Sequence, residues 1–192
     1  MFIVNPKNYR KSIGKLMQNN KNLTASLENY LKAIFNIVKE KKAARVKDVS
    51  KQLNIGASSV SEALRTLSER NLINYEPYGI ITLTDEGINK AEALLKRHDI
   101  IKNFFENVLS VSSELSEESA SQVEHVIPDE VMKKFVMFLT FMDTCSCKEP
   151  KWIKSFKHFS QNEKLSEKCV NCISKKREEP ELSNKNCCGM TK

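Results

Sequence analysis

The chain has 192 residues, of which 40% are hydrophobic, and it carries a formal net charge of +7 at pH 7. A chain of this length and composition can bury one or two cores without disulfide crosslinks. Its longest apolar run, Phe135 to Met142, is too short to cross a bilayer, and no apolar segment follows the basic N-terminus. These features argue against a membrane or secreted protein, so we expect a cytoplasmic one.

The positive charge is concentrated at the two ends of the chain. Residues 1–22 hold five basic residues and no acid, and residues 144–192 hold eleven basic residues and six acids, which gives +5 in each segment. Residues 23–143 therefore hold fifteen bases and eighteen acids, a charge of −3. Basic tails bind phosphate nonspecifically, but solvated, disordered ends have the same composition. Charge alone does not establish DNA binding, and we expect residues 1–22 to be a basic arm that is disordered or partly helical.

Three helices are predicted between Thr24 and Leu67. The first is capped by Thr24 or Ser26, ends in the polar run 39–42, and has apolar residues at helical spacing: Leu27, Tyr30, Leu31, Ile34, Ile37 and Val38. A short second helix carries Val46, Val49 and Leu53, and residues 54–56 form a turn. The third helix is capped near Ser58 or Ser59, and its buried side consists of Val60, Ala63, Leu64 and Leu67.

Residues 72–75 and 80–83 are predicted to be strands joined by a turn at 76–79. The order helix, helix, turn, helix, hairpin is that of a winged helix-turn-helix DNA-binding domain, which we assign to residues 23–84. The apolar pattern of the third helix leaves five residues outside that can contact DNA: Ser58, Ser59, Ser61, Glu62 and Arg65. Arg45 precedes the second helix, where it could meet the DNA backbone, and Tyr78 lies at the wing tip. The alternative is a small protein-interaction domain whose polar residues are merely exposed.

Residues 85–143 are predicted to form a second, helical domain. A long helix begins at 84–87 and continues to Phe105, another covers about 116–126, and a third runs from Pro128 to about Phe141. The apolar residues of these helices exceed what one thin helical layer buries, so a partner subunit is expected to cover the remainder. A symmetric homodimer matches the two-fold symmetry of palindromic operators in double-stranded DNA.

These segments resemble the iron- and manganese-dependent repressors of the diphtheria toxin repressor family. The likeness is carried by residues 27–34 (LENYLKAI), by the helix-turn-helix and wing closing with 83–87 (LTDEG), and by 97–105 (RHDIIKNFF) followed by 123–131 (VEHVIPDEV). The resemblance covers residues 24 to about 142. It implies a winged-helix domain, a helical dimerisation domain, and a divalent metal between the two that orders the dimer for DNA.

The resemblance also implies metal ligands, with departures. His98, Glu124 and His125 match family ligands of Fe²⁺ or Mn²⁺, whereas Asn29, Ser121, Lys32 and Lys102 stand where the family has other ligands or acids. Two ammonium groups oppose a divalent cation by direct repulsion. Two interpretations stay open: a weaker divalent site, or a polar cluster in which Lys32 or Lys102 pairs with Glu124 and no metal enters. We favour the second.

The family's small C-terminal domain has no evident counterpart, and residues 144–192 form a Cys-rich tail instead. Cys145 and Cys147 form a C-x-C pair, Cys169 and Cys172 form a C-x-x-C pair, and Cys187-Cys188 follow near the end. Four thiolates suit tetrahedral zinc or an iron–sulfur cluster. The segment between the pairs has helical spacing of Trp152, Ile153, Phe156 and Phe159.

The predicted fold is mostly α: a winged helix-turn-helix domain, a helical dimerisation domain and a small Cys-rich metal-binding tail. The predicted function is a DNA-binding transcriptional regulator that responds to metal, iron–sulfur or redox status. The alternative is a DNA-binding protein whose cysteines hold structural zinc without sensing. We expect no enzyme, because no Ser/His/Asp set or Gly-rich phosphate loop is present and Cys169–Cys172 lack the strand–helix unit of thiol oxidoreductases.

Overall fold

The computed structural model describes residues 23–144, 151–164 and 170. Within these residues the chain is mostly helical, and the elements follow in this order: α2 (Ala25–Lys41), α3 (Val46–Leu53), α4 (Ala57–Glu69), β1 (Ile73–Asn74), β2 (Thr82–Leu83), α5 (Asp85–Asn107), α6 (Ser113–Val123), α7 (Asp129–Thr144) and α8 (Lys151–Asn162). In the described part of the chain, no helix is both long and apolar enough to span a membrane. The predicted basic arm at 1–22 lies outside the described residues.

Helices α2, α3 and α4 form the predicted three-helix arrangement. Thr24 is the N-cap of α2, and its hydroxyl accepts a hydrogen bond from the backbone N–H of Leu27 at 3.3 Å. Helix α3 ends at Leu53, and its C-cap Asn54 takes a left-handed conformation with φ of 54°. The predicted cap of α4 at Ser58 or Ser59 is wrong, because α4 begins at Ala57 with Gly56 as its N-cap.

The wing is a shorter hairpin than predicted. β1 and β2 pair in antiparallel fashion, with Ile73 opposite Leu83 and Asn74 opposite Thr82. Beyond this pair, the carbonyl of Leu72 still accepts from the N–H of Thr84 at 3.2 Å, but other backbone groups next to the strands bond elsewhere. The N–H of Leu72 donates to the carbonyl of Leu67 at 3.0 Å, and Ile81 bridges to Ala44 ahead of α3 rather than to the opposite strand.

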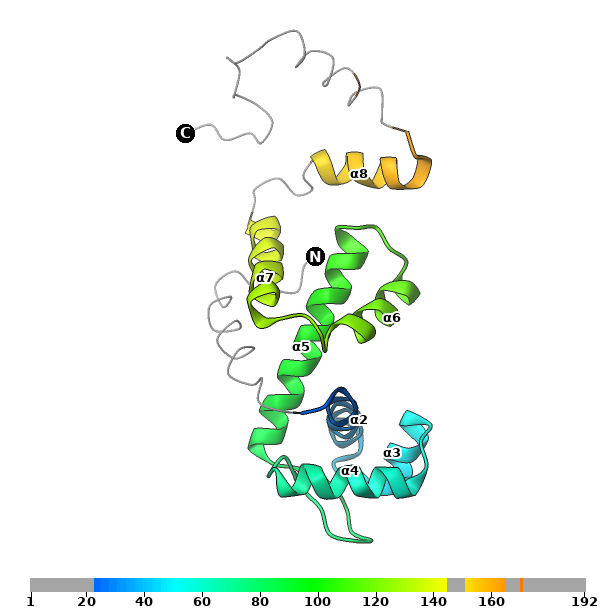
Figure 1. Ribbon diagram of the computed structural model, residues 1–192, viewed down its shortest axis with the longest axis vertical. Coiled ribbons are helices and arrows are strands. Elements are labelled where there is room, and N and C mark those ends of the chain that lie inside the picture. The colour runs from blue at the N-terminus through cyan, green and yellow to red at the C-terminus, as the bar shows by residue number, and fades with distance from the viewer. Residues whose placement is uncertain (1–22, 145–150, 165–169, 171–192) are drawn as a thin grey trace.

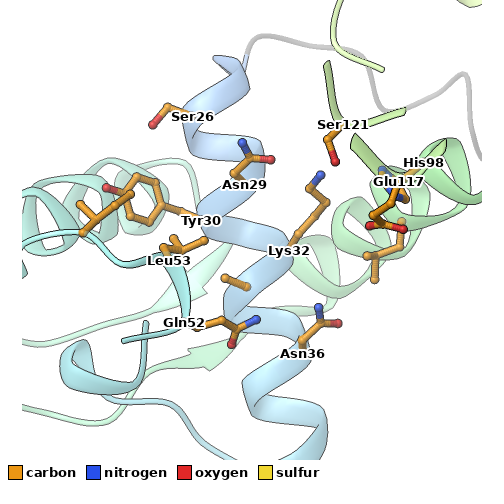
Figure 2. Close-up of a pocket in the computed structure, with 13 residues that line it drawn as sticks. Ser26, Asn29, Tyr30, Lys32, Asn36, Gln52, Leu53, His98, Glu117 and Ser121 are labelled. Carbon is orange, nitrogen blue, oxygen red and sulfur yellow. The ribbon is translucent and has the colours of Figure 1, made fainter. Parts of the chain in front are cut away.

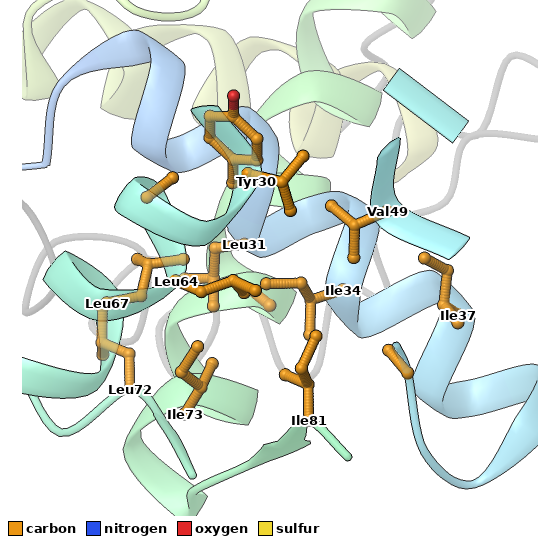
Figure 3. Packing of buried hydrophobic residues seen from close by; sticks show 14 of the residues in the cluster. Tyr30, Leu31, Ile34, Ile37, Val49, Leu64, Leu67, Leu72, Ile73 and Ile81 are labelled. Carbon is orange, nitrogen blue, oxygen red and sulfur yellow. The ribbon is translucent and has the colours of Figure 1, made fainter. Parts of the chain in front are cut away.

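One hydrophobic core holds the winged-helix domain together. Side chains from α2, α4 and the wing meet in its centre, and the fully buried ones include Leu31, Ile34, Leu64, Leu67 and Ile81 (Figure 3). The first turn of α5 packs closely on this domain. A Cβ at Gly87 would overlap the carbonyl oxygen of Leu72, so only glycine allows this approach.

Helix α5 connects the two halves of the molecule, with α2 to α4 near its start and α6 and α7 beside its end (Figure 1). A second core forms where α5, α6 and α7 meet, around Ile101, Met132, Val136 and Leu139. Aromatic rings extend it, and Phe104 meets Phe135 edge-on with 4.7 Å between ring centroids. The predicted mostly helical fold, with a winged helix followed by a helical domain, is confirmed.

The boundaries of the later helices differ from the predicted ones. Helix α6 begins at Ser113 rather than Ser116, because the hydroxyl of Ser112 accepts a hydrogen bond from the N–H of Leu115 at 3.4 Å and caps the helix early. It ends at Val123, and α7 runs to Thr144, three residues beyond the predicted end. Helix α8 confirms the helical spacing noted between the cysteine pairs.

Candidate nucleic-acid interface and interdomain cluster

Helix α4 has one face in the core and one face in solvent. Val60, Ala63, Leu64 and Leu67 are buried, as the sequence pattern predicted. Ser58, Ser59, Glu62 and Arg65 are exposed on the opposite side. Ser61 is half-buried, and its hydroxyl donates to the carbonyl of Ala57 at 2.9 Å, so it is less available than its neighbours.

The other predicted DNA-contacting residues lie on elements that flank α4. Arg45 is exposed at the start of α3, where its backbone N–H donates to the carboxylate of Asp48 at 3.0 Å. Tyr78 at the wing tip is fully exposed and has a φ of 67°. Helix α4 and the wing loop lie at the same end of the molecule, with α3 beside them (Figure 1).

A polar cluster joins the winged-helix domain to the second domain. At its centre is Glu124, which directly follows α6 and is only 4% exposed. Its carboxylate accepts a hydrogen bond from the ammonium of Lys32 on α2 and lies 3.0 Å from Nδ1 of His98 on α5. One buried carboxylate therefore links three helices, and Figure 2 shows Lys32 of α2 extending toward His98 and Glu117.

Both histidines of the cluster bridge acidic groups. Nε2 of His98 lies 3.0 Å from a carboxylate oxygen of Glu117, whose other oxygen accepts from Lys102 at 2.7 Å. Nδ1 of His125 lies 2.6 Å from Oε2 of Glu28, and its Nε2 lies 3.3 Å from Glu124. The result is a connected network running from α2 through the end of α6 to α5.

The electrostatics of the cluster follow from these pairings. The hydrogen bond with Glu124 raises the pKa of His98, which favours its charged form. Burial alone would raise the pKa of Glu124, but the hydrogen bonds from His98 and Lys32 hold it below the usual range. The hydrogen bond from Lys102 lowers the pKa of Glu117. These hydrogen bonds favour the ionised forms of Glu117 and Glu124, and the partners come from the chain itself.

This arrangement does not fit a divalent metal ion. His98, Glu124 and His125 come together as predicted, but the ammonium of Lys32 lies on the central carboxylate. Ser121 and Asn29 line the adjoining cleft with uncharged side chains (Figure 2). Among residues 23–144, 151–164 and 170, no group of three or more His, Cys, Asp or Glu side chains is arranged to hold a metal ion. The pairing of Lys32 with Glu124 is the contact expected in the ion-paired interpretation of the sequence.

Sequence reasoning missed two residues of this region. Glu28 contacts His125 although the two are 97 positions apart, and its place one helical turn before Lys32 is the signal that could have revealed it. Arg97 ties α5 to the segment after α6. Its guanidinium donates to the carbonyl oxygens of Glu124 at 2.7 Å and of Ile127, and to the carboxylate of Asp129 at 2.9 Å.

The predicted cysteine site lies outside the described residues. This applies to Cys145, Cys147, Cys169 and Cys172, as well as to Cys187 and Cys188. Along the sequence, the described parts nearest to these cysteines are the end of α7, helix α8 and Val170.

Residues 22–81 match the N-terminal DNA-binding domain of iron-dependent repressors, and residues 84–153 match the metal-binding and dimerisation domain of the same proteins. The chain belongs to the iron-dependent repressor family. Members of the iron-dependent repressor family are DNA-binding transcriptional regulators rather than enzymes, and they dimerise and bind divalent metal through the second domain. The resemblance noted in the sequence is thereby confirmed.

Relatives within the family include bacterial and archaeal regulators. The chain is 33% identical over 118 residues to an HTH-type transcriptional regulator of Methanocaldococcus jannaschii, which covers 61% of this chain and 94% of that protein. It is 30% identical over 102 residues to the HTH-type transcriptional regulator MntR of Oceanobacillus iheyensis, covering 53% of this chain and 69% of the relative.

Solved structures of similar proteins share the fold. A manganese-dependent transcriptional repressor in complex with manganese aligns with a TM-score of 0.54 and 29% identity over 60% of this chain and 53% of the other. This chain thus spans about half the length of that repressor. A Sulfolobus solfataricus protein aligns with a TM-score of 0.51 and 26% identity over 61% of this chain and 89% of its own.

Proposed function

We propose that this chain is a homodimeric, cytoplasmic transcriptional regulator that binds palindromic double-stranded DNA through α4 and the wing. The observation that carries the proposal is the division of α4 into a buried apolar face and an exposed polar face. A helix held this way fits the major groove, where each base pair presents a distinct set of hydrogen-bonding groups.

Each exposed side chain has a role that its chemistry supports. Arg65 can donate two hydrogen bonds to a guanine, and Glu62 can accept from a cytosine amine. Ser58 and Ser59 lie at the N-terminus of α4, which attracts phosphate oxygens. Arg45 and Tyr78 are exposed, and the proposal assigns them contacts with a phosphate and with the DNA flank of the half-site, respectively.

A second copy of the chain is expected to cover the exposed apolar residues of α7. Val131 is 44% exposed and Met137 is 46% exposed on this helix. A two-fold dimer would present two α4 helices to half-sites about one helical turn, ~34 Å, apart. The two-fold symmetry of the operator would then follow from that of the protein.

DNA selection tests the proposal directly. The full-length protein, purified without oxygen, is mixed with a random-sequence duplex library, and bound DNA is recovered and sequenced. We expect a two-fold symmetric motif with half-sites about one helical turn apart. Recovery of no motif, or of single unpaired half-sites, would contradict the proposal.

Arg65→Ala then tests the assigned face. Loss of one bidentate base contact costs about 1–3 kcal/mol, so affinity for the selected duplex should fall about tenfold or more in fluorescence anisotropy. Lys96→Ala is the matched control, because Lys96 is an exposed basic residue of α5 outside α4. Equal losses in the two variants would show that general charge, not the face of α4, determines binding.

We further propose that the signal enters through Cys145, Cys147, Cys169 and Cys172 as an iron–sulfur cluster. Thiolates are soft ligands that suit such a cluster, whereas the interdomain cluster offers imidazoles and a central carboxylate that already pairs with Lys32. The alternative is structural zinc, which the same four thiolates would hold without any sensing role.

Metal and sulfide analysis separates the two possibilities. Protein purified without oxygen is assayed for iron, sulfide and zinc and for visible absorption, next to a variant with all four cysteines replaced by serine. Iron and sulfide with visible absorption, lost in the variant, would support the cluster. A colourless protein with one zinc per chain would support the structural role and contradict cluster sensing.

A further inference from the structure

The junction between the two domains contains a positive charge supplied by the chain itself. Lys32 belongs to α2 of the winged-helix domain, and Glu124 follows α6 of the second domain. Their side chains are 15% and 4% exposed, so the pair is largely shielded from water. Salt and water screen such a pair less than they screen an ion pair at the surface. This pair also joins two domains rather than two turns of one helix.

The carboxylates around this ion pair already have partners within the chain. The cluster holds the carboxylates of Glu28, Glu117 and Glu124, and it holds the ammonium groups of Lys32 and Lys102 beside two imidazoles. A divalent cation would add two positive charges beside an ammonium already in contact with the central carboxylate, which Coulomb repulsion opposes.

We propose that the ammonium of Lys32 takes the place of a divalent cation at this junction and holds the DNA-binding domain on the dimerisation domain without metal. The junction therefore does not respond to iron or manganese. This inference concerns the regulation of the proposed DNA-binding protein, but it rests on the geometry of the junction and its first test involves no DNA.

Lys32 is then the residue that prevents divalent cations from binding at the junction. Lys32→Glu replaces the ammonium with a carboxylate in the same position, next to Glu124, His98 and His125. Carboxylates and imidazoles together are a donor set that Mn²⁺ and Fe²⁺ accept. A single substitution is thus expected to convert the internal ion pair into a site for a divalent cation.

Binding of Mn²⁺ by the full-length protein tests the proposal. Manganese prefers oxygen ligands to thiolates, so the cysteines do not obscure the measurement. Free Mn²⁺ is followed by electron paramagnetic resonance as protein is added. We expect Lys32→Glu to bind one Mn²⁺ per chain about tenfold or more tightly than the wild type, because an attractive charge replaces a repulsive one.

Two further variants show whether the gain belongs to this junction. Lys32→Glu combined with His98→Ala should lose the gained affinity, because an imidazole of the new site is removed. Lys39→Glu makes the same charge change at an exposed position of α2 and should leave Mn²⁺ binding as in the wild type. A gain in Lys39→Glu equal to that in Lys32→Glu would overturn the proposal, since general charge would then explain it.

The wild type alone also decides the matter, even if Lys32→Glu does not fold. The proposal is supported if the wild type shows no Mn²⁺ binding that is weakened by His98→Ala. Binding of one Mn²⁺ per wild-type chain with affinity that falls tenfold or more in His98→Ala would overturn it. Neither result depends on whether the selected DNA motif is found, so failure here is distinct from failure of the proposed function.

Discussion

The two hydrophobic cores of this protein differ in how much of their apolar surface they bury. In the winged-helix domain, Leu31, Ile34 and Leu64 are fully buried around one centre. In the second domain, α7 buries Val136 and Leu139 but leaves Val131 and Met137 nearly half exposed. The first domain is complete within one chain, whereas the second presents a face that another copy of the chain can cover.

Shortening a side chain in the first core is expected to have the largest effect. Leu64→Ala creates a cavity in a fully buried position of α4 and should lower the free energy of unfolding by about 2–5 kcal/mol. Ile80→Ala at the wing shortens a side chain that is 56% exposed and should change the free energy of unfolding by less than about 0.5 kcal/mol. Urea unfolding measures both, and similar losses would contradict the view that this core is tightly closed.

The attachment of α5 to the first core is tested by a glycine substitution. Gly87→Ala places a methyl group against the carbonyl of Leu72, and we expect a loss of about 1–3 kcal/mol from the forced backbone shift. Gly56→Ala is the matched control, because the nearest atom to its added Cβ is the hydroxyl of Ser58 at 3.9 Å. Thermal unfolding of the two variants should separate them clearly, and equal melting temperatures would refute the close packing of α5.

The open face of the second domain is tested by a charge. Met137→Asp should weaken the dimer about tenfold, or ~1.4 kcal/mol, because a carboxylate would lose its water in the subunit interface. Ile80→Asp makes the same kind of change at an exposed apolar residue of the wing. Sedimentation across a concentration range reports the association. Unchanged dimerisation of Met137→Asp would place the subunit contact elsewhere.

Apolar periodicity was sufficient to predict the order of elements, and local backbone contacts decided where the predictions failed. The buried residues of α4 were predicted correctly because apolar residues recur along it at regular helical spacing. The strands were predicted too long, since alternation does not reveal that Leu72 donates back to α4 or that Ile81 pairs with Ala44. The early start of α6 depends on one capping hydroxyl, that of Ser112, in a run of several serines.

Most members of the interdomain cluster were predicted, but Glu28 and the pairings were not. The sequence indicated His98, Glu124 and His125, yet it left open whether Lys32 or Lys102 reaches Glu124. The structure pairs Lys32 with Glu124 and Lys102 with Glu117. Such choices depend on how α2 and α5 pack, which residue spacing within one helix does not encode. Contact of α4 with DNA stays a prediction.

The most direct test is the affinity of the wild-type protein for its selected duplex under two conditions. The first contains a chelator that removes loosely bound divalent ions, and the second contains added Mn²⁺. The account predicts equal dissociation constants within about twofold, because the ammonium of Lys32 already holds the junction and no cation is needed there. A gain in affinity of tenfold or more with Mn²⁺, abolished in His98→Ala, would contradict it and show that the junction senses metal after all.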